Sequence, residues 1–237
     1  MPAEGDFTHQ ATHCRVAFVL CEENLRAIIF ANGDASDPDI VRRWTARADL
    51  IIAADGGTRH ALSAGVMPQV VIGDLDSLAD ADREQLDRSG VQLIVYPTHK
   101  DYTDLELALR YAREQQATEI IIFSALGGRW DQSLANLMLL TLPELAQVPT
   151  RMVDHSLSVQ VIRDRAEITG RVGDTLSLIA LQGDARGVTI EGCEYPLNEA
   201  TLPFGATLGI SNVLAQPTAI ITVKQGQILA LHTRREE

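Results

Sequence analysis

The sequence predicts an α/β protein in which a mostly parallel sheet domain is followed by a smaller all-β domain with a sandwich-like or barrel-like arrangement. Over the first part of the chain, short apolar runs alternate with helical patterns, which is typical of a parallel sheet. After Pro149, short apolar runs are separated by Gly, Asp, Asn and Pro, and no helical stripe remains, which is typical of small antiparallel sheets. We therefore expect an N-terminal extension of unknown order at residues 1–24, an α/β domain at 25–148 and a β domain at 149–237.

The α/β part contains five apolar runs of strand length, each bounded by turn or helix signals. The predicted strands are Ala27–Phe30, Leu50–Ala53, Val70–Ile72, Leu93–Tyr96 and Ile120–Ser124. Between the first two, Asp37 is suited to cap a helix whose first position is Pro38. A second helix is expected from about Thr58 to Ala64, because Gly65 is a typical residue just beyond a helix end.

The best-marked helix of the chain begins at Thr103. Thr103 and Glu106 have the spacing of a capping box, in which each side chain binds a backbone N–H near the helix start. One apolar stripe follows at Leu105, Ala108, Leu109 and Ala112. A further helix is expected after Asp131, with Leu134, Leu137 and Met138 facing the core.

The β part is expected to hold short antiparallel strands. The runs that predict them are Ser158–Ile162, Thr175–Leu181, Gly187–Ile190, Ala219–Val223 and Ile228–Leu231. The boundary between the two parts is placed near Pro143–Pro149, where the pattern changes.

The charge and the cysteines exclude several classes of protein. A net charge of −12 argues against a non-specific nucleic-acid binder and against adhesion to anionic membranes, since both need a basic face. Three cysteines without zinc-like spacing imply no disulfide framework, which fits a reducing compartment. The apolar stretch Val16–Cys21 is too short to span a membrane and follows acidic residues, so it makes a poor signal peptide. We therefore expect a cytoplasmic protein.

Polar loops follow four of the predicted strands, all at the same edge of the sheet. Ligands of open α/β sheets bind outside the carboxyl ends of the strands, so these loops are expected to form the site. The four loops contain Asp55-Gly56-Gly57, Gly73-Asp74-Leu75-Asp76-Ser77, Pro97 to Asp104, and Gly127-Gly128-Arg129-Trp130-Asp131.

The acidic residues of these loops favour a divalent metal site. Asp74 and Asp76 are two apart in an extended loop, so their carboxylates can converge on a hard cation such as Mg²⁺. Ordinary turn chemistry explains the same pair, and the helix dipole alone would favour Asp104 in a first helical turn. However, these residues together with Asp55 and Asp101 would repel one another at one sheet edge without a cation. The cluster therefore favours a metal.

The last of the four loops supplies the opposite charge. Glycines after a strand allow backbone N–H groups to approach an anion, Arg129 can bind a phosphate through two N–H groups, and Lys100 can add a point charge. A tight turn and a solvated surface arginine are the alternative interpretations. No Walker A, dinucleotide-binding, serine-hydrolase or zinc-protease motif is present. Phosphates beside carboxylates require Mg²⁺ between them, which indicates nucleotide phosphoryl or pyrophosphoryl chemistry.

Taken in order, these motifs resemble those of the thiamine pyrophosphokinase family. The resemblance rests on Asp55-Gly56-Gly57, Gly73 to Ser77, Lys100-Asp101-x-Thr103-Asp104 and Gly127-Gly128-Arg129-x-Asp131-Gln132-x-x-Ala135-Asn136. In the β part, Gly187-Val188-Thr189, Tyr195-Pro196-Leu197 and Gly209-Ile210-Ser211-Asn212 are similar to that family's second domain. The resemblance covers roughly residues 25 to 232.

The resemblance implies transfer of the pyrophosphoryl group of ATP to the hydroxyl of thiamine, giving thiamine diphosphate and AMP. It implies a catalytic cluster of Asp55, Asp74, Asp76 and Asp104, with Mg²⁺ bound by Asp74, Asp76 and Asp104. It places Lys100, Asp101, Thr103, Gly127, Gly128, Arg129 and Asp131 beside ATP, and Ser211 and Asn212 beside thiamine. It also implies a homodimer.

Two positions depart from the family's pattern, and two other functions stay open. Gln132 stands where bacterial members commonly have His, and Tyr102 replaces an often polar residue, but neither touches the acidic cluster. The alternatives are a pyrophosphokinase for another alcohol, such as a hydroxymethyl-pterin, and a non-catalytic sensor of nucleotide or thiamine diphosphate. The motif at Ser211 and Asn212 favours thiamine, and retention of the acidic residues argues against a sensor.

Overall fold

The structure is a computed structural model that describes residues 24–76 and 78–235. The expected extension at residues 1–24 lies, apart from its last residue, outside this range, and so does Ser77 of the second motif. Within the described residues, no helix is long and apolar enough to cross a membrane.

The first half of the chain forms the parallel part of one large sheet. Its strands are β1 (Arg26–Phe30), β2 (Leu50–Ala54), β3 (Val70–Gly73), β4 (Gln92–Val95), β5 (Glu119–Phe123) and β6 (Thr150–Asp154). They lie side by side in the order β4-β3-β2-β1-β5-β6, and all are parallel. The five predicted strands are confirmed, and β6 is an additional one. Because the order reverses between β1 and β5, a crevice is expected at the carboxyl ends of these two strands.

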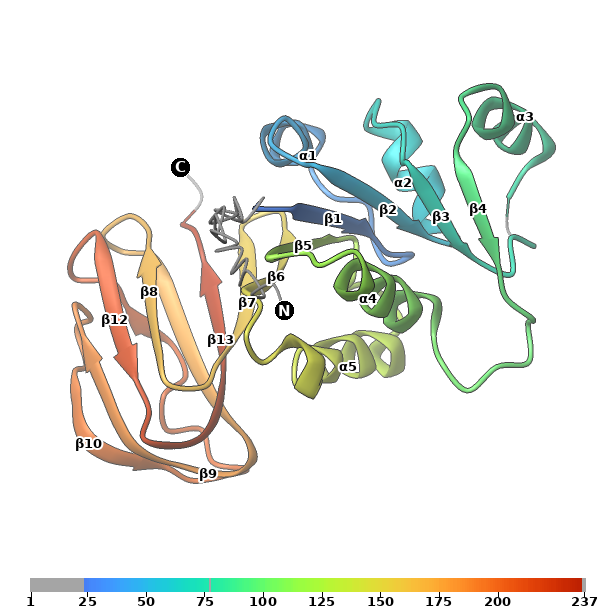
Figure 1. Cartoon of the computed structure of the whole chain (residues 1–237). Coiled ribbons are helices and arrows are strands. Elements are labelled where there is room, and N and C mark those ends of the chain that lie inside the picture. The colour runs from blue at the N-terminus through green and yellow to red at the C-terminus, as the bar shows by residue number, and fades with distance from the viewer. Residues whose placement is uncertain (1–23, 77, 236–237) are drawn as a thin grey trace, which may run out of the picture.

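Helices cover both faces of this parallel part. They are α1 (Pro38–Thr45), α2 (Gly57–Ser63), α3 (Asp80–Arg88), α4 (Asp104–Glu114) and α5 (Trp130–Leu139), followed by the short 3₁₀ helix η1 (Pro143–Leu145). Figure 1 shows α4 and α5 on one face and α1, α2 and α3 on the other. The cores agree with this arrangement, because residues of α4 pack with one set of strand side chains and residues of α1 and α2 with the opposite set. The result is a three-layer α/β part.

The predicted helix starts at Asp37 and Thr103 are confirmed. The Asp37 side chain accepts a hydrogen bond from the Asp39 N–H at 2.7 Å, and Pro38 is the first residue of α1. The Thr103 hydroxyl accepts from the Glu106 N–H at 3.2 Å and so caps α4. The helix expected at about residues 58–64 is also present as α2, and Gly65 follows it with a φ of +76°.

The predicted buried face of α5 is wrong in part. Leu137 is partly buried against the core, but Leu134 is 55% exposed and Met138 is 44% exposed. The helix is attached instead through polar groups: the Ser133 hydroxyl is bonded to Gly127, and the Asn136 amide donates to the Ala125 carbonyl at 2.7 Å. These contacts rotate Leu134 and Met138 outward.

The second half continues the same sheet with antiparallel strands. They are β7 (Leu157–Ile162), β8 (Arg165–Thr169), β9 (Thr175–Glu191), β10 (Leu197–Leu202), β11 (Asn212–Val213), β12 (Thr218–Thr222) and β13 (Gln225–Thr233). The order continues from β6 as β7-β13-β9-β12-β8, with β10 and β11 both paired to β9. Figure 1 shows these strands curling around a second core. The predicted β-rich part is therefore confirmed, although the runs at 175–181 and 187–190 belong to one long strand.

The two halves are joined by hydrogen bonds as well as by the chain. Strand β6 pairs with β5 on one side and with β7 on the other, where Met152 lies opposite Val159. The core beneath α4 also includes Leu181 and Leu229 from the second half. The proposed domain boundary between residues 148 and 149 stays a prediction, since β6 begins just after it and completes the parallel part of the sheet.

Candidate active site

A pocket of about 460 Å³ opens where the strand order reverses. The loops after β1, β2 and β5 and the first turns of α4 and α5 form its walls. Its volume is within the range of small-molecule sites, about 300–1,000 Å³. Of the predicted site residues, Asp55, Thr103, Asp104, Gly127, Gly128 and Arg129 line it.

An acidic cluster lies at the β2 and β3 side of this pocket. Asp55, Asp74 and Asp76 each have a carboxylate oxygen within 4.8 Å of the others. Asp55 has a φ of +43° and its N–H donates to the Ile72 carbonyl at 2.8 Å, which fixes the loop after β2 against β3. A Cβ at Gly73 would lie 2.8 Å from the Asp55 Cβ, so only glycine allows the two loops to approach this closely. The geometry therefore brings three predicted residues together.

The charges within the cluster act on one another. The Asp76 N–H donates to the Asp74 carboxylate at 3.3 Å and lowers the pKa of Asp74. A hydrogen bond to Asp74 and the negative charge of that group raise the pKa of Asp76. The charged form of Asp76, which its neighbour disfavours, is stabilised when a cation lies between the two carboxylates.

Asp104 stands beside the cluster and is paired with Lys100. The Lys100 Nζ lies 2.9 Å from Asp104 Oδ1, and both side chains are largely buried. Burial raises the pKa of Asp104, whereas the ammonium group of Lys100 opposes this increase. Asp101 is exposed on the loop between β4 and α4. The ammonium group of Lys100 therefore places one positive charge next to the acidic residues.

The opposite wall carries the glycines and Arg129. The Arg129 Nη2 lies 2.5 Å from Asp131 Oδ2, and the two side chains are 70% and 67% exposed at the rim. A side chain at Gly128 would meet open space, whereas a Cβ at Gly127 would lie 2.8 Å from Asp34. This wall is thus open at Gly128 and closely packed at Gly127.

Sequence reasoning missed the loop after β1. Asn32, Gly33 and Asp34 line the pocket. The N–H groups of Gly33 and Asp34 donate to the carbonyls of Ser124 at 2.6 Å and Leu126 at 2.7 Å, which ties this loop to the one after β5. The signal was available, because a polar Asn-Gly-Asp turn follows a predicted strand at the same sheet edge as the four loops considered.

Ser211 and Asn212 lie elsewhere, in a separate pocket of about 340 Å³ in the second half. The Asn212 side chain is 4% exposed and holds the backbone of Tyr195, accepting from its N–H at 3.0 Å and donating to its carbonyl at 2.7 Å. Strand β11, which begins at Asn212, pairs with β9, six strands from β2 along the sheet. At about 4.8 Å per strand this is roughly 29 Å measured along the sheet. The structure does not bring this pair to the acidic cluster.

Both halves of the chain match known families. Residues 41–152 match the family described as "Thiamin pyrophosphokinase, catalytic domain", and residues 158–228 match "Thiamin pyrophosphokinase, vitamin B1 binding domain". A thiamine pyrophosphokinase of Bacillus subtilis (strain 168) is 31% identical over 198 residues, which cover 83% of this chain and 92% of that protein.

Solved structures agree over nearly the whole length. The crystal structure of thiamine pyrophosphokinase from Bacillus subtilis superposes with a TM-score of 0.81 at 28% identity and covers 89% of this chain and 100% of its own. That of thiamin pyrophosphokinase from Geobacillus thermodenitrificans has a TM-score of 0.78 at 28% identity and covers 90% and 99%. The likeness therefore extends over the acidic pocket and over the pocket at Ser211 and Asn212.

Proposed function

The chain belongs to the thiamin pyrophosphokinase family, and from this premise we propose how its acidic pocket carries out the reaction. The enzyme transfers the pyrophosphoryl group of ATP to the hydroxyl of thiamine, giving thiamine diphosphate and AMP. The observation that carries the proposal is the convergence of Asp55, Asp74 and Asp76 within 4.8 Å beside a pocket of about 460 Å³.

The donor set fits Mg²⁺. Three carboxylate oxygens within 4.8 Å of one another are hard ligands for a divalent cation. The pKa of Asp76 is raised by its hydrogen bond to Asp74 and by the negative charge of that group, and a bound cation would offset this charge. Asp74 and Asp76 would hold the ion together with Asp104 from the start of α4. When bound, Mg²⁺ neutralises and orients the phosphate oxygens of ATP.

Other groups of the pocket bind the phosphates and accept the proton of the alcohol. Arg129, at the rim, and the open backbone at Gly128 face the nucleotide phosphates, and Lys100 adds a positive charge next to Asp104. A primary alcohol is a poor nucleophile, so one carboxylate of the cluster orients the thiamine hydroxyl and accepts its proton. The alcohol attacks the β-phosphorus in line with departing AMP, and the released proton passes to that carboxylate.

We further propose that the thiamine side of each site comes from the partner subunit of a homodimer. Support comes from the separation of Ser211 and Asn212 from the acidic cluster and from two exposed apolar surfaces. One lies on α5, where Trp130 is 77%, Leu134 55% and Met138 44% exposed. The other lines the pocket at Ser211 and Asn212, where Tyr195 is 65%, Leu208 53% and Ile210 42% exposed. A two-fold interface would cover both surfaces twice and join unlike half-sites.

One assay tests the reaction itself. AMP formation from MgATP is measured with thiamine, with a hydroxymethyl-pterin or without an acceptor. Thiamine-dependent AMP release is expected. Pterin-dependent release without a response to thiamine would identify the alternative pyrophosphokinase, and nucleotide binding without AMP release would indicate a sensor.

Mixing of two impaired chains, assayed at thiamine concentrations well below the wild-type KM, tests the shared site. An Asp74→Asn chain and a Ser211→Ala, Asn212→Ala chain are combined under conditions where subunits exchange, as shown by mass. Partial recovery of activity is expected, because one site of each hybrid receives two intact halves. Exchange without recovery at any mixing ratio would mean that each site is built within one chain.

A further inference from the structure

A third pocket, which is polar and has a volume of about 150 Å³, lies in the curled part of the sheet, away from the acidic cluster and from Ser211 and Asn212. On one side it is bounded by the face of β6, β7 and β13, and on the other by β8, where the strand order ends. Water occupies about 30 Å³ in the liquid, so the pocket has room for roughly five waters or one small ion. It is too small for a nucleotide.

Strand register brings polar side chains to one face of this pocket. Arg151 of β6 lies opposite Gln160 of β7, and Gln160 lies opposite Ala230 of β13. One step along, Ser158 lies opposite His232. Because side chains two residues apart on a strand point to the same face, these residues share one side of the sheet. Ala230 is small and leaves the space between them open.

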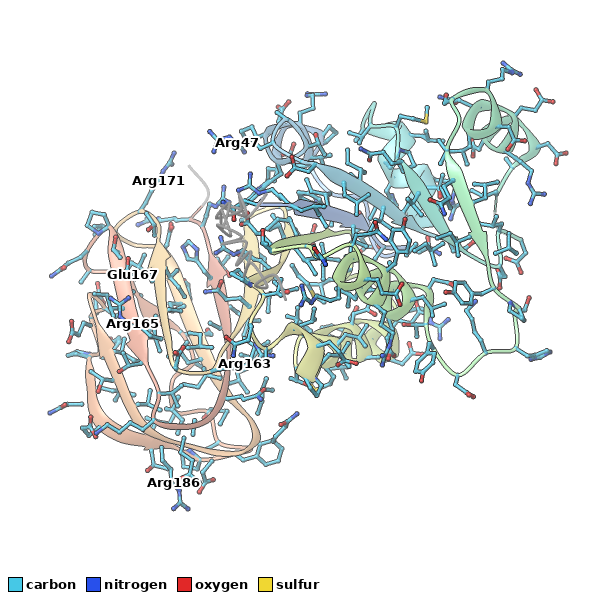
Figure 2. The ribbon with its side chains drawn as sticks, in the orientation of Figure 1. Arg47, Arg163, Arg165, Glu167, Arg171 and Arg186 are labelled. Atoms are coloured by element: carbon cyan, nitrogen blue, oxygen red, sulfur yellow. The ribbon has the colours of Figure 1, made fainter. Side chains whose placement is uncertain are left out.

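The edge strand β8 closes the pocket with Thr169 and with Glu167. Figure 2 shows Arg165 and Glu167 on this strand. The charge of Glu167 is already neutralised, because the Arg165 Nη2 lies 2.6 Å from its carboxylate. Glu167 therefore does not serve as the counter-ion of Arg151.

Apart from His232, the side-chain donors that face this pocket have no partners within residues 24–76 and 78–235. No carboxylate of these residues lies within ion-pair distance of Arg151, and the side chains of Arg151, Ser158, Gln160 and Thr169 make no hydrogen bond to them. Burial lowers the pKa of the Arg151 guanidinium. The positive charge of Arg234 acts in the same direction, whereas the negative charge of Glu119 opposes it, but the Glu119 carboxylate is already paired with Arg26 at 2.5 Å. A partly desolvated cation whose neighbouring carboxylate is engaged elsewhere is stabilised by a further anion.

The nearby buried carboxylate of Asp174 is fully engaged by other groups. It accepts from the N–H groups of Arg171 and Arg235 and from His232 Nε2, each at 2.9 Å. These bonds fix the ring of His232 at the pocket wall and leave Arg151 without this carboxylate as a partner.

We propose that this pocket binds a small tetrahedral oxyanion of the phosphate type, with Arg151 as its counter-charge. Ser158, Gln160 and Thr169, from two other strands, supply hydrogen-bond donors around it. A cation is excluded by the charge of Arg151, and an apolar ligand by the polar lining. The site is separate from the acidic pocket and needs no Mg²⁺.

Thermal unfolding in increasing inorganic phosphate, without Mg²⁺ or ATP and at constant ionic strength, tests the proposal. The matched variants are Arg151→Met and Arg186→Met, of which the second removes an exposed arginine that neither lines the pocket nor pairs with a residue that lines it. We expect a saturable rise of the unfolding midpoint for the wild type and for Arg186→Met. Arg151→Met should need at least about tenfold more phosphate, the scale of a lost charged hydrogen bond. General salting-out stabilises all three chains without saturation and is thereby distinguished.

Two further measurements keep the test decisive. Without phosphate, Arg151→Met should unfold at the wild-type temperature or above it, because the change removes a partly desolvated charge that makes no ion pair within residues 24–76 and 78–235. In wild-type crystals soaked in selenate, anomalous density is expected between Arg151 and Thr169. A wild type with no saturable response, an Arg151→Met chain with the wild-type response, or an equal response to acetate would overturn the proposal.

Discussion

Replacement of Asn212 by alanine separates a structural role from a ligand role. In the structure, the Asn212 side chain accepts hydrogen bonds from the N–H groups of Tyr195 and Val213 and donates to the Tyr195 carbonyl. The side chain is 4% exposed, so water does not replace these bonds readily. The neighbouring Ser211 is exposed, and within the part of the chain that the structure describes its hydroxyl makes no hydrogen bond, whereas its backbone N–H donates to Ser177 Oγ at 3.0 Å. The two residues therefore form a matched pair.

The expected magnitude follows from the three bonds. At about 0.5–1.5 kcal/mol each, their loss in Asn212→Ala costs roughly 3 kcal/mol of folding free energy. For a chain of this size, 1 kcal/mol corresponds to about 2–4 °C, so the unfolding midpoint should fall by roughly 6–12 °C. Ser211→Ala should leave the midpoint within about 2 °C of the wild type, since a surface change away from bonds costs less than about 0.5 kcal/mol.

Kinetics and calorimetry together decide between the roles. Thermal unfolding is measured for both variants, and KM for thiamine and for ATP is measured well below their midpoints. We expect both variants to raise the thiamine KM at least severalfold, with little effect on the ATP KM, but only Asn212→Ala to lose stability. An Asn212→Ala chain with the wild-type midpoint would refute the clamp on Tyr195, and an equal rise of both KM values would remove the pair from the thiamine side.

The remaining predictions concern the acidic cluster, a buried carboxylate and the pocket walls. Asp74→Asn and Asp76→Asn should each lower kcat for AMP release about a hundredfold at limiting Mg²⁺, while thermal unfolding without Mg²⁺ shows no loss of stability, because repulsion is relieved. Burial alone would raise the pKa of Asp174. The three hydrogen-bond donors to its carboxylate outweigh this effect, so its pKa in the folded chain lies below the ordinary value. The stability that they give is therefore present above the ordinary carboxyl pKa and is lost as the pH falls through the folded pKa; unfolding followed across acidic pH should show this loss in the wild type and not in Asp174→Asn. A Cβ at Gly33 would lie 2.2 Å from a backbone oxygen of the loop after β5, so Gly33→Ala should cost about 1–3 kcal/mol by thermal unfolding, whereas Gly128→Ala, which meets nothing within 4 Å, should unfold like the wild type.

The parallel strands and the acidic loops could be predicted because their signals are local. Each predicted strand is a short apolar run, and polar loops rich in Gly and Asp follow most of them. Parallel strands present these loops at one edge of the sheet. The helix α3 gave no such signal, since Leu86 is its only buried residue and most of the rest are charged. The strand β6 was not predicted as part of the parallel sheet. The hydrophobic pattern changes at Pro149, so the domain boundary was placed just before this strand.

Errors at α5 and β9 come from patterns that the sequence leaves ambiguous. Leucines and a methionine occur on more than one face of α5, so hydrophobic periodicity does not show which face is buried. The hydrogen bonds between Ser133 and Gly127 determine that face. Along β9, Gln182, Gly183 and Gly187 have positive φ values, which bend the strand without ending it. The separation of Asn212 from the acidic cluster depends on the order of strands in the sheet, and no local motif encodes that order.

The continuous ladder through β5, β6 and β7 limits how this chain can be divided. The two family matches meet between residues 152 and 158, which is the β6–β7 hairpin. A fragment cut there would end in a β6 edge whose N–H and C=O groups have lost their partners, and such an edge recruits strands from other molecules. It would also lose Val159, Leu181 and Leu229 from beneath α4. The catalytic half is therefore expected to aggregate when it is produced alone, so biochemical dissection of this enzyme depends on point substitutions in the intact chain.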